Sequence, residues 1–330
     1  MKAWLAMNIR MGLVERSEID DIWSTDPVVG DPFMKGIMSR HRYWAINRYF
    51  HIADNAQAVQ NRNHPNFDPM YKVRFMIDLV NERFAEVYKP GQCLSVDEAM
   101  IKFKGRHHAK QYMPKKPIKW GFKVWMCAES DTGYALRVQV YEGKARDPAR
   151  LADRQQNGLG FDVVKSLTKD YQGKNHIVYY DRFFSSVALA RYLLTKETYV
   201  NSTEMLNRKG LPPAAMNLKL KKGQPCRQFL STDDNVLVTV FHDKRQISHL
   251  STGCQPGIDA NVGKPIANCD YNKHMGGVDL SDQHKSYYAV GRKARKWWRC
   301  IVWYLFNIGI TNAYLVWRAS TPLLTAALTS

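Results

Sequence analysis

The sequence lacks any close pairing of its cysteines. The six of them lie far apart and form no Cys-x-x-Cys or Cys-His spacing, which excludes a zinc finger and a disulfide-stapled scaffold. We expect reduced, buried thiols in an intracellular protein. Residues 1–13 contain neither a continuous apolar run nor a small-residue cleavage site, so no secretory signal peptide is expected there.

Acidic residues are scarce, and in two long stretches they are missing. The chain has 48 Lys and Arg against 30 Asp and Glu, a net charge of +18. No acidic residue lies between Ala99 and Ala128, where eight Lys or Arg occur, and none follows Asp282. Clustered positive charge favours a polyanionic partner, with nucleic acid ahead of an anionic membrane surface.

Long apolar runs are also rare. The one exception is Cys300–Trp317, eighteen residues without a charge. A membrane span needs about twenty predominantly apolar residues, and Asn307, Thr311 and Asn312 interrupt this run. We therefore predict a buried helix, docked on a helix at Met70–Tyr88, rather than a transmembrane segment.

The remaining composition is that of a folded protein. The 330 residues, 45% apolar and 24% charged, are enough for two or three units with real cores. Residues 1–90 show helical spacing of apolar residues, for example over 42–52 and 70–88, with a polar loop at 55–69 between them.

From residue 93 the apolar pattern changes to alternation, which is typical of strands. A strand at 94–100 precedes a hairpin formed by 122–128 and 136–140; a helix at 161–170, a buried strand at 177–180, a helix at 186–196 and a further strand at 198–201 follow. This β-β-β-α-β-α order predicts a mixed α/β (α+β) domain with a ribonuclease H-like core. Residues 202–267, rich in Pro, Gly and Lys and alternating over 236–240, predict a strand-rich insertion.

Three aspartates occupy positions where such a fold would bring them together. Asp97 lies on the first predicted strand, Asp181 directly follows the fourth, and Asp279 lies on a helix beyond the insertion. Carboxylate oxygens suit Mg²⁺ or Mn²⁺, and two such ions about 4 Å apart support phosphodiester cleavage and transfer. Asp282 shares a helix face with Asp279 and is either a further ligand or a helix N-terminal charge. Glu98 is expected on the opposite face of the strand from Asp97.

Two basic, aromatic-rich segments are the candidates for nucleic-acid contact. The alternative is a solvated face beside core aromatics. The predicted contact residues of the first segment are Lys102, Lys104, Arg106, Lys115, Lys116 and Lys119, and those of the second are Arg292, Lys293, Arg295 and Lys296.

Several ordered segments resemble the piggyBac transposase family. LSVDEAMIKFKGR at 94–106 and QYMPKKPIKWG at 111–121 are similar to its first-aspartate block, and YDRFFSS at 180–186 to its second. NRKGLP at 207–212 and DKR at 243–245 resemble parts of its insertion domain, and YNKHMGGVDLSDQ at 271–283 resembles its third-aspartate block. The matches keep their order over most of the chain.

This resemblance implies a function and a domain organisation. The function is metal-dependent cut-and-paste transposition at TTAA sites in double-stranded DNA, with Asp97, Asp181 and Asp279 catalytic and Asp282 close by. A catalytic core at 93–201 and 268–284 would hold an insertion at 202–267. A helical DNA-binding and dimerisation domain would be split between 1–92 and 285–330. We expect a nuclear homodimer with no membrane association.

The sequence also departs from the family pattern. Arg182 stands where the family usually has Asn, and the family's disordered N-terminal region and Cys-rich C-terminal module have no counterpart here. The chain is then a fragment, a decayed copy or a domesticated derivative. The competing functions are an inactive DNA-binding protein descended from a transposase and a generic metal nuclease, of which the second does not explain the ordered matches.

Overall fold

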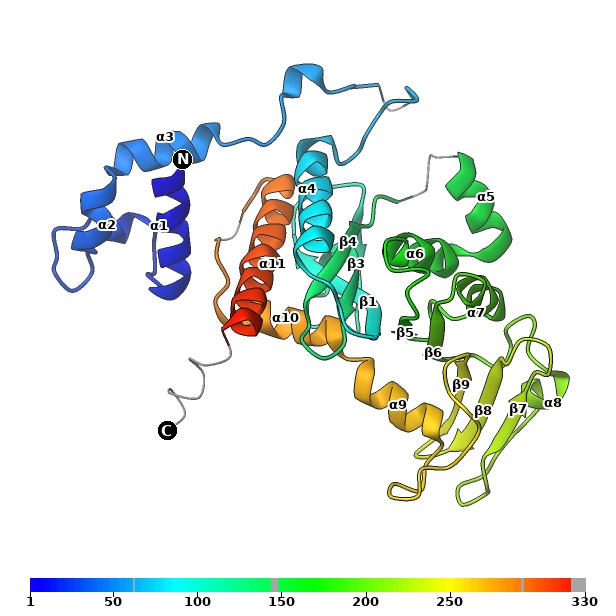
Figure 1. The fold of residues 1–330 in the computed structure, drawn as a ribbon. Helices are drawn as coiled ribbons and strands as arrows, with labels where there is room; N and C mark the ends of the chain where they lie inside the picture. The colour runs from blue at the N-terminus through cyan, green and yellow to red at the C-terminus, as the bar shows by residue number, and fades with distance from the viewer. Residues whose placement is uncertain (62, 144–147, 292–293, 322–330) are drawn as a thin grey trace.

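A computed structural model describes residues 1–61, 63–143, 148–291 and 294–321 (Figure 1). Its first part is helical, as predicted: α1 (Lys2–Leu13), α2 (Pro32–Ile37), α3 (Arg40–Tyr49) and α4 (Tyr71–Val87). Its sheet contains β1 (Cys93–Lys102), β2 (Lys110–Tyr112), β3 (Trp120–Glu129), β4 (Ala135–Val140), β5 (Ile177–Tyr180), β6 (Tyr199–Thr203), β7 (Arg227–Leu230), β8 (Leu237–His242) and β9 (Gln246–Ser251). The remaining helices are α5 (Pro148–Asn157), α6 (Leu159–Thr168), α7 (Val187–Leu194), α8 (Pro213–Met216), α9 (Ile266–His274), α10 (Gly277–Tyr287) and α11 (Trp297–Ser320).

The sheet confirms the ribonuclease H-like prediction. Its strand order is β2-β3-β1-β5-β6-β9-β8-β7, with β4 also paired to β3. β1 runs antiparallel to β3 and parallel to β5, and β5 is parallel to β6. Figure 1 shows α4, α10 and α11 on one side of these strands and α6 and α7 on the other. Helices cover both faces of the sheet, and β3 is therefore buried over almost its whole length. Strands covered on both faces need apolar residues along their whole length.

The segment 202–267 is strand-rich, as expected, but its strands do not form a sheet of their own. β9 pairs antiparallel with β6, and β8 and β7 follow outward, so one continuous sheet runs from the core into this segment. The alternation that marked 236–240 corresponds to β8. Several elements were not predicted individually, among them β2, which has only three residues, α5, and the strands β7 and β9.

The helices α1 to α3 have a small core of their own, made by Trp4, Met7, Met11, Ile22, Met34 and Tyr43. Local capping fixes where α2 begins. The Asp31 carboxylate accepts a hydrogen bond from the Met34 amide (3.0 Å), with Pro32 in the first turn of α2. The Trp303 ring of α11 packs on Trp4, with 5.8 Å between ring centroids, and connects this core to the rest of the chain.

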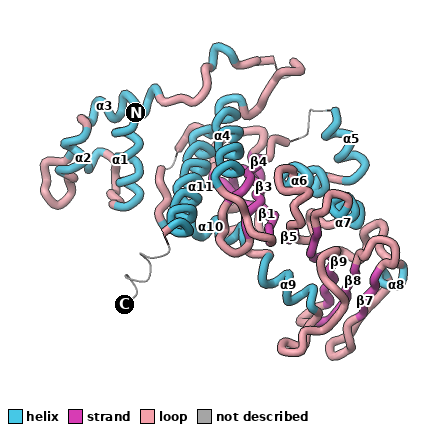
Figure 2. Tube along the Cα trace, in the orientation of Figure 1, coloured by secondary structure: helices cyan, strands magenta, loops and turns pink. Residues whose placement is uncertain are grey.

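The predicted apolar helix is α11, and it packs alongside α4 (Figure 2). By length and composition it is the single helix in the described ranges that qualifies as a membrane span. Its apolar side is instead part of the main core, through Ile301, Leu305, Ile308 and Leu315. Trp303 is only partly buried, although the helix as a whole was predicted to be buried.

Asparagines on α4 and α11 cover the outer edge of the sheet at β4. The Asn81 side chain donates to the Val138 carbonyl (2.9 Å) and accepts from the Val138 amide (2.8 Å). Asn312 makes the same pair of bonds to Ala135, at 2.8 and 3.0 Å. Both amides therefore stand in for a neighbouring strand, and the edge has no unpaired backbone groups at these residues.

All six cysteines are free, as predicted, but only Cys127 is buried as expected, and the other five are partly exposed.

Candidate functional site

Asp97 and Asp181 lie side by side because of the sheet register. β1 and β5 are parallel, and Val96 pairs with Tyr180, so the residues that follow each of them are neighbours. Burial, with a contribution from the negative charge of Asp181, raises the pKa of Asp97 to about 6. Burial also raises the pKa of Asp181. Two partly desolvated carboxylates therefore lie next to each other. The positive charge near them lowers their pKa values less than burial raises them.

The surroundings of these two aspartates include one lysine. Lys116 donates a hydrogen bond to the carbonyl of Glu98 (3.0 Å), and its Nζ lies 4.0 Å from Asp97 Oδ2. Its positive charge lowers the pKa of Asp97, but less than burial raises it. Lys116, which was predicted to contact DNA, therefore also belongs to the carboxylate site. Asp181 Oδ1 accepts from the amide of Phe183 (2.9 Å), which fixes the turn after β5.

Glu98 and Arg182 have smaller roles. Glu98 forms a salt bridge with Lys123 at 2.6 Å, so its carboxylate already has a partner, although its charge contributes to the raised pKa of Asp181. Arg182 is exposed. Its positive charge lowers the pKa of Asp181, but less than burial raises that pKa. The guanidinium beside the site therefore exerts only a weak electrostatic effect on that carboxylate.

Asp279 and Asp282 both lie on α10. Asp279 lies in the first turn of α10 and is exposed, and Asp282 makes a salt bridge to Lys285 at 2.5 Å. The first turn of α10 does pack on β1, since a Cβ added to Gly277 would meet Ser95 Oγ at 2.5 Å. No group of three or more His, Cys, Asp or Glu that could hold a metal occurs within the described residues. Convergence of Asp279 on Asp97 and Asp181 stays a prediction.

Most of the predicted DNA-contact residues are exposed. Lys102, Lys104, Arg106, Lys115, Lys119, Arg295 and Lys296 are open to solvent, and Lys116 is partly buried. Arg292 and Lys293 lie outside the described residues.

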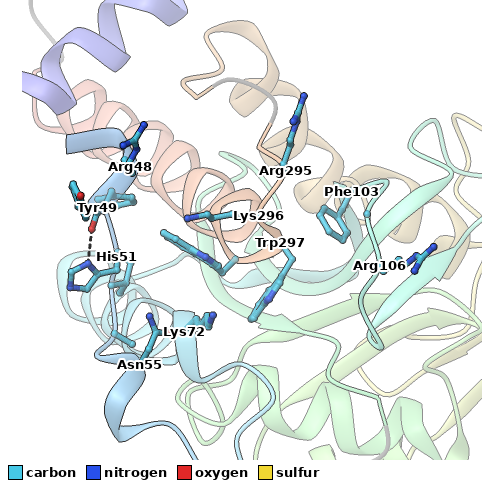
Figure 3. Close-up of a pocket in the computed structure, with 15 residues that line it drawn as sticks. Arg48, Tyr49, His51, Asn55, Lys72, Phe103, Arg106, Arg295, Lys296 and Trp297 are labelled. Atoms are coloured by element: carbon cyan, nitrogen blue, oxygen red, sulfur yellow. Dashed lines mark hydrogen bonds between the residues drawn. The ribbon is translucent and has the colours of Figure 1, made fainter. Parts of the chain in front are cut away.

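The two predicted basic segments meet at one cavity (Figure 3). Arg106 comes from the loop after β1, and Arg295 and Lys296 come from the segment that leads into α11. Arg48 at the end of α3 and Lys72 in the first turn of α4 also line it, and sequence reasoning did not single them out. The sequence around Arg48 and Lys72 does not predict a binding role, because only the packing of α3 and α4 against α11 brings these two side chains to the cavity.

Comparison with known proteins gives consistent results. The family described as Transposase IS4 matches residues 1–314. The human PiggyBac transposable element-derived protein 3 is 27% identical over 336 residues, covering 95% of this chain and 54% of that protein. The human PiggyBac transposable element-derived protein 2 is 24% identical over 337 residues, 96% of this chain and 55% of that protein. The chain thus spans about half the length of these curated relatives.

A solved structure agrees over the same length. The cryo-EM structure of the piggyBac transposase synaptic complex with hairpin DNA matches with a TM-score of 0.81 and 25% sequence identity. The match covers 97% of this chain and 66% of that one.

Proposed function

Because the chain belongs to the piggyBac-type transposase family, we propose that it cuts and joins DNA strands in a metal-dependent, cut-and-paste reaction at TTAA sites. Double-stranded DNA at transposon ends and at the target is the proposed substrate. The proposal extends to a homodimer that works in the nucleus.

One observation carries the catalytic proposal, namely that the parallel register of β1 and β5 sets Asp97 beside Asp181. These two residues sit at neighbouring positions of the central strands, where the core is covered on both faces and cannot shift easily. Asp279 is the proposed third carboxylate and would act from the first turn of α10, which packs on β1 next to Ser95. Asp282 is proposed to lie close to the site without being essential.

The carboxylates of Asp97 and Asp181 fit the binding of two Mg²⁺ or Mn²⁺ ions. Both are half-buried carboxylates with raised pKa values, and a divalent cation would relieve the cost of their charge. When bound, two such ions polarise the attacking oxygen and stabilise the leaving oxygen. Asp97 and Asp181 would orient them, and Lys116 would hold a DNA phosphate beside Asp97.

A domesticated DNA-binding protein without catalysis is the second candidate. Two observations favour it: Asp279 is exposed, and Lys285 already pairs with Asp282. An excision assay with matched terminal repeats, scored for repair to TTAA, distinguishes the two functions. Excision supports the transposase, whereas DNA binding without excision at any divalent ion concentration supports the domesticated protein.

We expect binding to duplex DNA to weaken steeply as salt rises. The net charge of +18 and the two acid-free stretches provide many phosphate contacts, and each contact releases a counterion. Titration of labelled duplex at increasing NaCl should give a strongly negative slope of log K against log salt, about −0.9 for each phosphate neutralised. A flat response would contradict the polyanion hypothesis.

Lys104→Gln is expected to make that slope shallower by about one unit, since one phosphate contact is lost. Lys174→Gln provides the matched control. Lys174 is also exposed, but it lies near β5 and donates to the carbonyl of Asp170, outside both basic segments. An equal change of slope for both variants would mean that the positive charge acts as a whole rather than through the named segment.

We expect Mn²⁺ binding to strengthen between about pH 5 and 7. Because the pKa of Asp97 is about 6, its proton must leave before a cation binds, and affinity should change by up to about tenfold per pH unit below that value. Stability changes in the opposite direction. The folded-state pKa lies above the ordinary 3.8, so this carboxyl stabilises the fold less as pH rises from about 4 through 6. Electron paramagnetic resonance of Mn²⁺ at several pH values tests this, and Asp97→Asn should flatten the curve.

A further inference from the structure

Three side chains form a row across the inner strands of the sheet. Ser95 on β1 pairs with Tyr179 on β5, and Tyr179 pairs in turn with Asn201 on β6. Side chains two positions apart on a strand point to the same sheet face. Asp97 follows Ser95 by two positions and Asp181 follows Tyr179 by two, so the row and the carboxylate pair share one face of the sheet.

The helices α9 and α10 lie across this row. Figure 1 shows α9 leading from the outer strands of the sheet to α10. At the start of α10, a Cβ added to Gly277 would meet Ser95 Oγ at 2.5 Å. In the first turn of α9, the carbonyl of Ala267 accepts a hydrogen bond from the side-chain amide of Asn201 (2.8 Å). Both helices therefore contact the sheet one step away from the carboxylate pair.

One carboxylate on α9 is the centre of a hydrogen-bond network. Asp270 Oδ2 accepts from the Tyr179 hydroxyl (2.9 Å) and from the Asn201 amide (2.9 Å). It also accepts from the thiol of Cys254 (3.5 Å), which follows β9 where the chain returns from the segment 202–267. One turn further along α9, His274 Nδ1 lies 3.1 Å from Asp270 Oδ1, and its ring packs on Tyr179 with 5.0 Å between centroids. Asp270 thus joins β5, β6 and the end of that segment to α9.

These bonds fix the position of α9 more closely than apolar packing alone. The donors to Asp270 are neutral groups, and in the described ranges no salt bridge joins Asp270 to a Lys or an Arg. Hydrogen bonds to a carboxylate are short, directional and stronger than those between neutral groups. The next residue, Tyr271, is buried, and the negative charges of Asp181 and Asp97 add to the rise in its pKa that burial causes. The anchored helix therefore lies close to the carboxylate pair.

The anchor is also close along the chain to Asp279. α9 ends at His274 and α10 begins at Gly277, so only Met275 and Gly276 separate the two helices. Asp279 lies in the first turn of α10. A connection of two residues allows little independent movement, so the placement of α9 limits where Asp279 can lie.

We propose that Asp270, held by Tyr179 and Asn201, is a positioning residue that sets α9 and α10 so that Asp279 reaches the metal site at Asp97 and Asp181. This inference rests on the proposed function, which takes Asp279 as the third carboxylate. Asp270 acts only through the helices and does not itself contact the metal ions.

The experiment measures Mn²⁺ affinity of the full chain by electron paramagnetic resonance in a double-variant comparison. Tyr179→Phe removes the hydroxyl that donates to Asp270 and keeps the ring. We expect Tyr179→Phe and Asp279→Asn each to lower Mn²⁺ affinity about tenfold, as loss of an outer partner of a metal ligand does. The variant with both changes should bind no more weakly than Asp279→Asn alone, because the hydroxyl acts through Asp279.

Tyr199→Phe is the matched control. Tyr199 is a partly buried tyrosine on β6, and the hydrogen bonds of the Asp270 carboxylate within the described residues do not include it. Its loss of a hydroxyl should leave Mn²⁺ affinity unchanged. Asp270→Asn, which removes one of the two carboxylate oxygens, should reproduce the loss seen in Tyr179→Phe, and melting temperatures show that each variant is folded.

Two results would overturn the inference and leave the proposed function intact. One is a tenfold loss of affinity in Asp279→Asn with none in Tyr179→Phe, even if Tyr179→Phe melts at a lower temperature, since the network would then be structural only. The other is a pair of losses that multiply in the double variant, which would make them independent. Unchanged affinity in Asp279→Asn would instead remove Asp279 from the proposed metal site, and this inference with it.

Discussion

Asp97→Asn should abolish excision, lowering its rate about a thousandfold or more. That factor corresponds to roughly 4 kcal/mol of lost transition-state stabilisation, a plausible share for one ligand of a two-ion site. The same variant should bind duplex DNA at least as well as the unaltered protein, because it loses a negative charge near Lys116. Excision of a terminal-repeat substrate and duplex binding by anisotropy are the two measurements.

The matched control is Asp78→Asn, an exposed aspartate on α4 rather than on β1 or in the turn after β5. It should excise normally. Asp97→Asn should also melt at the same temperature as the unaltered protein at pH 7, or higher, because burial makes the charge of Asp97 unfavourable in the folded state. Normal excision by Asp97→Asn would remove Asp97 from the reaction, and lost excision together with lost folding would assign it a structural role.

Deleting residues 300–318 should unfold the protein. The deletion removes Ile301, Leu305, Ile308 and Leu315 from the main core, each worth about 1.5–3 kcal/mol. Their sum is comparable to the 5–15 kcal/mol that stabilises a typical domain. Circular dichroism and thermal melting of the purified variant are the measurements. A folded variant with unchanged melting would show that α11 is peripheral, and recovery of the intact protein with membranes would show that α11 spans a bilayer.

A point substitution tests the same helix without removing it. Asn312→Ala leaves the amide and the carbonyl of Ala135 without partners, at a cost of about 1–3 kcal/mol for each group. Asn66→Ala, at an exposed loop position, should change stability by less than about 0.5 kcal/mol. Equal melting temperatures for the two variants would mean that water replaces the bonds at the β4 edge.

Local patterns predicted the elements of the core well. Alternation over 122–128 and 136–140 became β3 and β4, and the short apolar run at 177–180 became β5. These predictions succeeded because alternation and a short apolar run are the two patterns that strands with one or two covered faces show. The short β2 was missed, since three residues carry no periodic signal.

The sequence by itself determined the kind of chemistry available to this protein, through the placement of Asp97 and Asp181 around the inner strands, the surplus of positive charge and the ordered family motifs. Only the tertiary structure decided which groups meet. It set Asp97 beside Asp181 through the register of β1 and β5. It also brought Arg48 and Lys72 to the same cavity as Lys296. Contacts between residues hundreds of positions apart depend on the packing of whole helices and strands, and no local spacing encodes that packing.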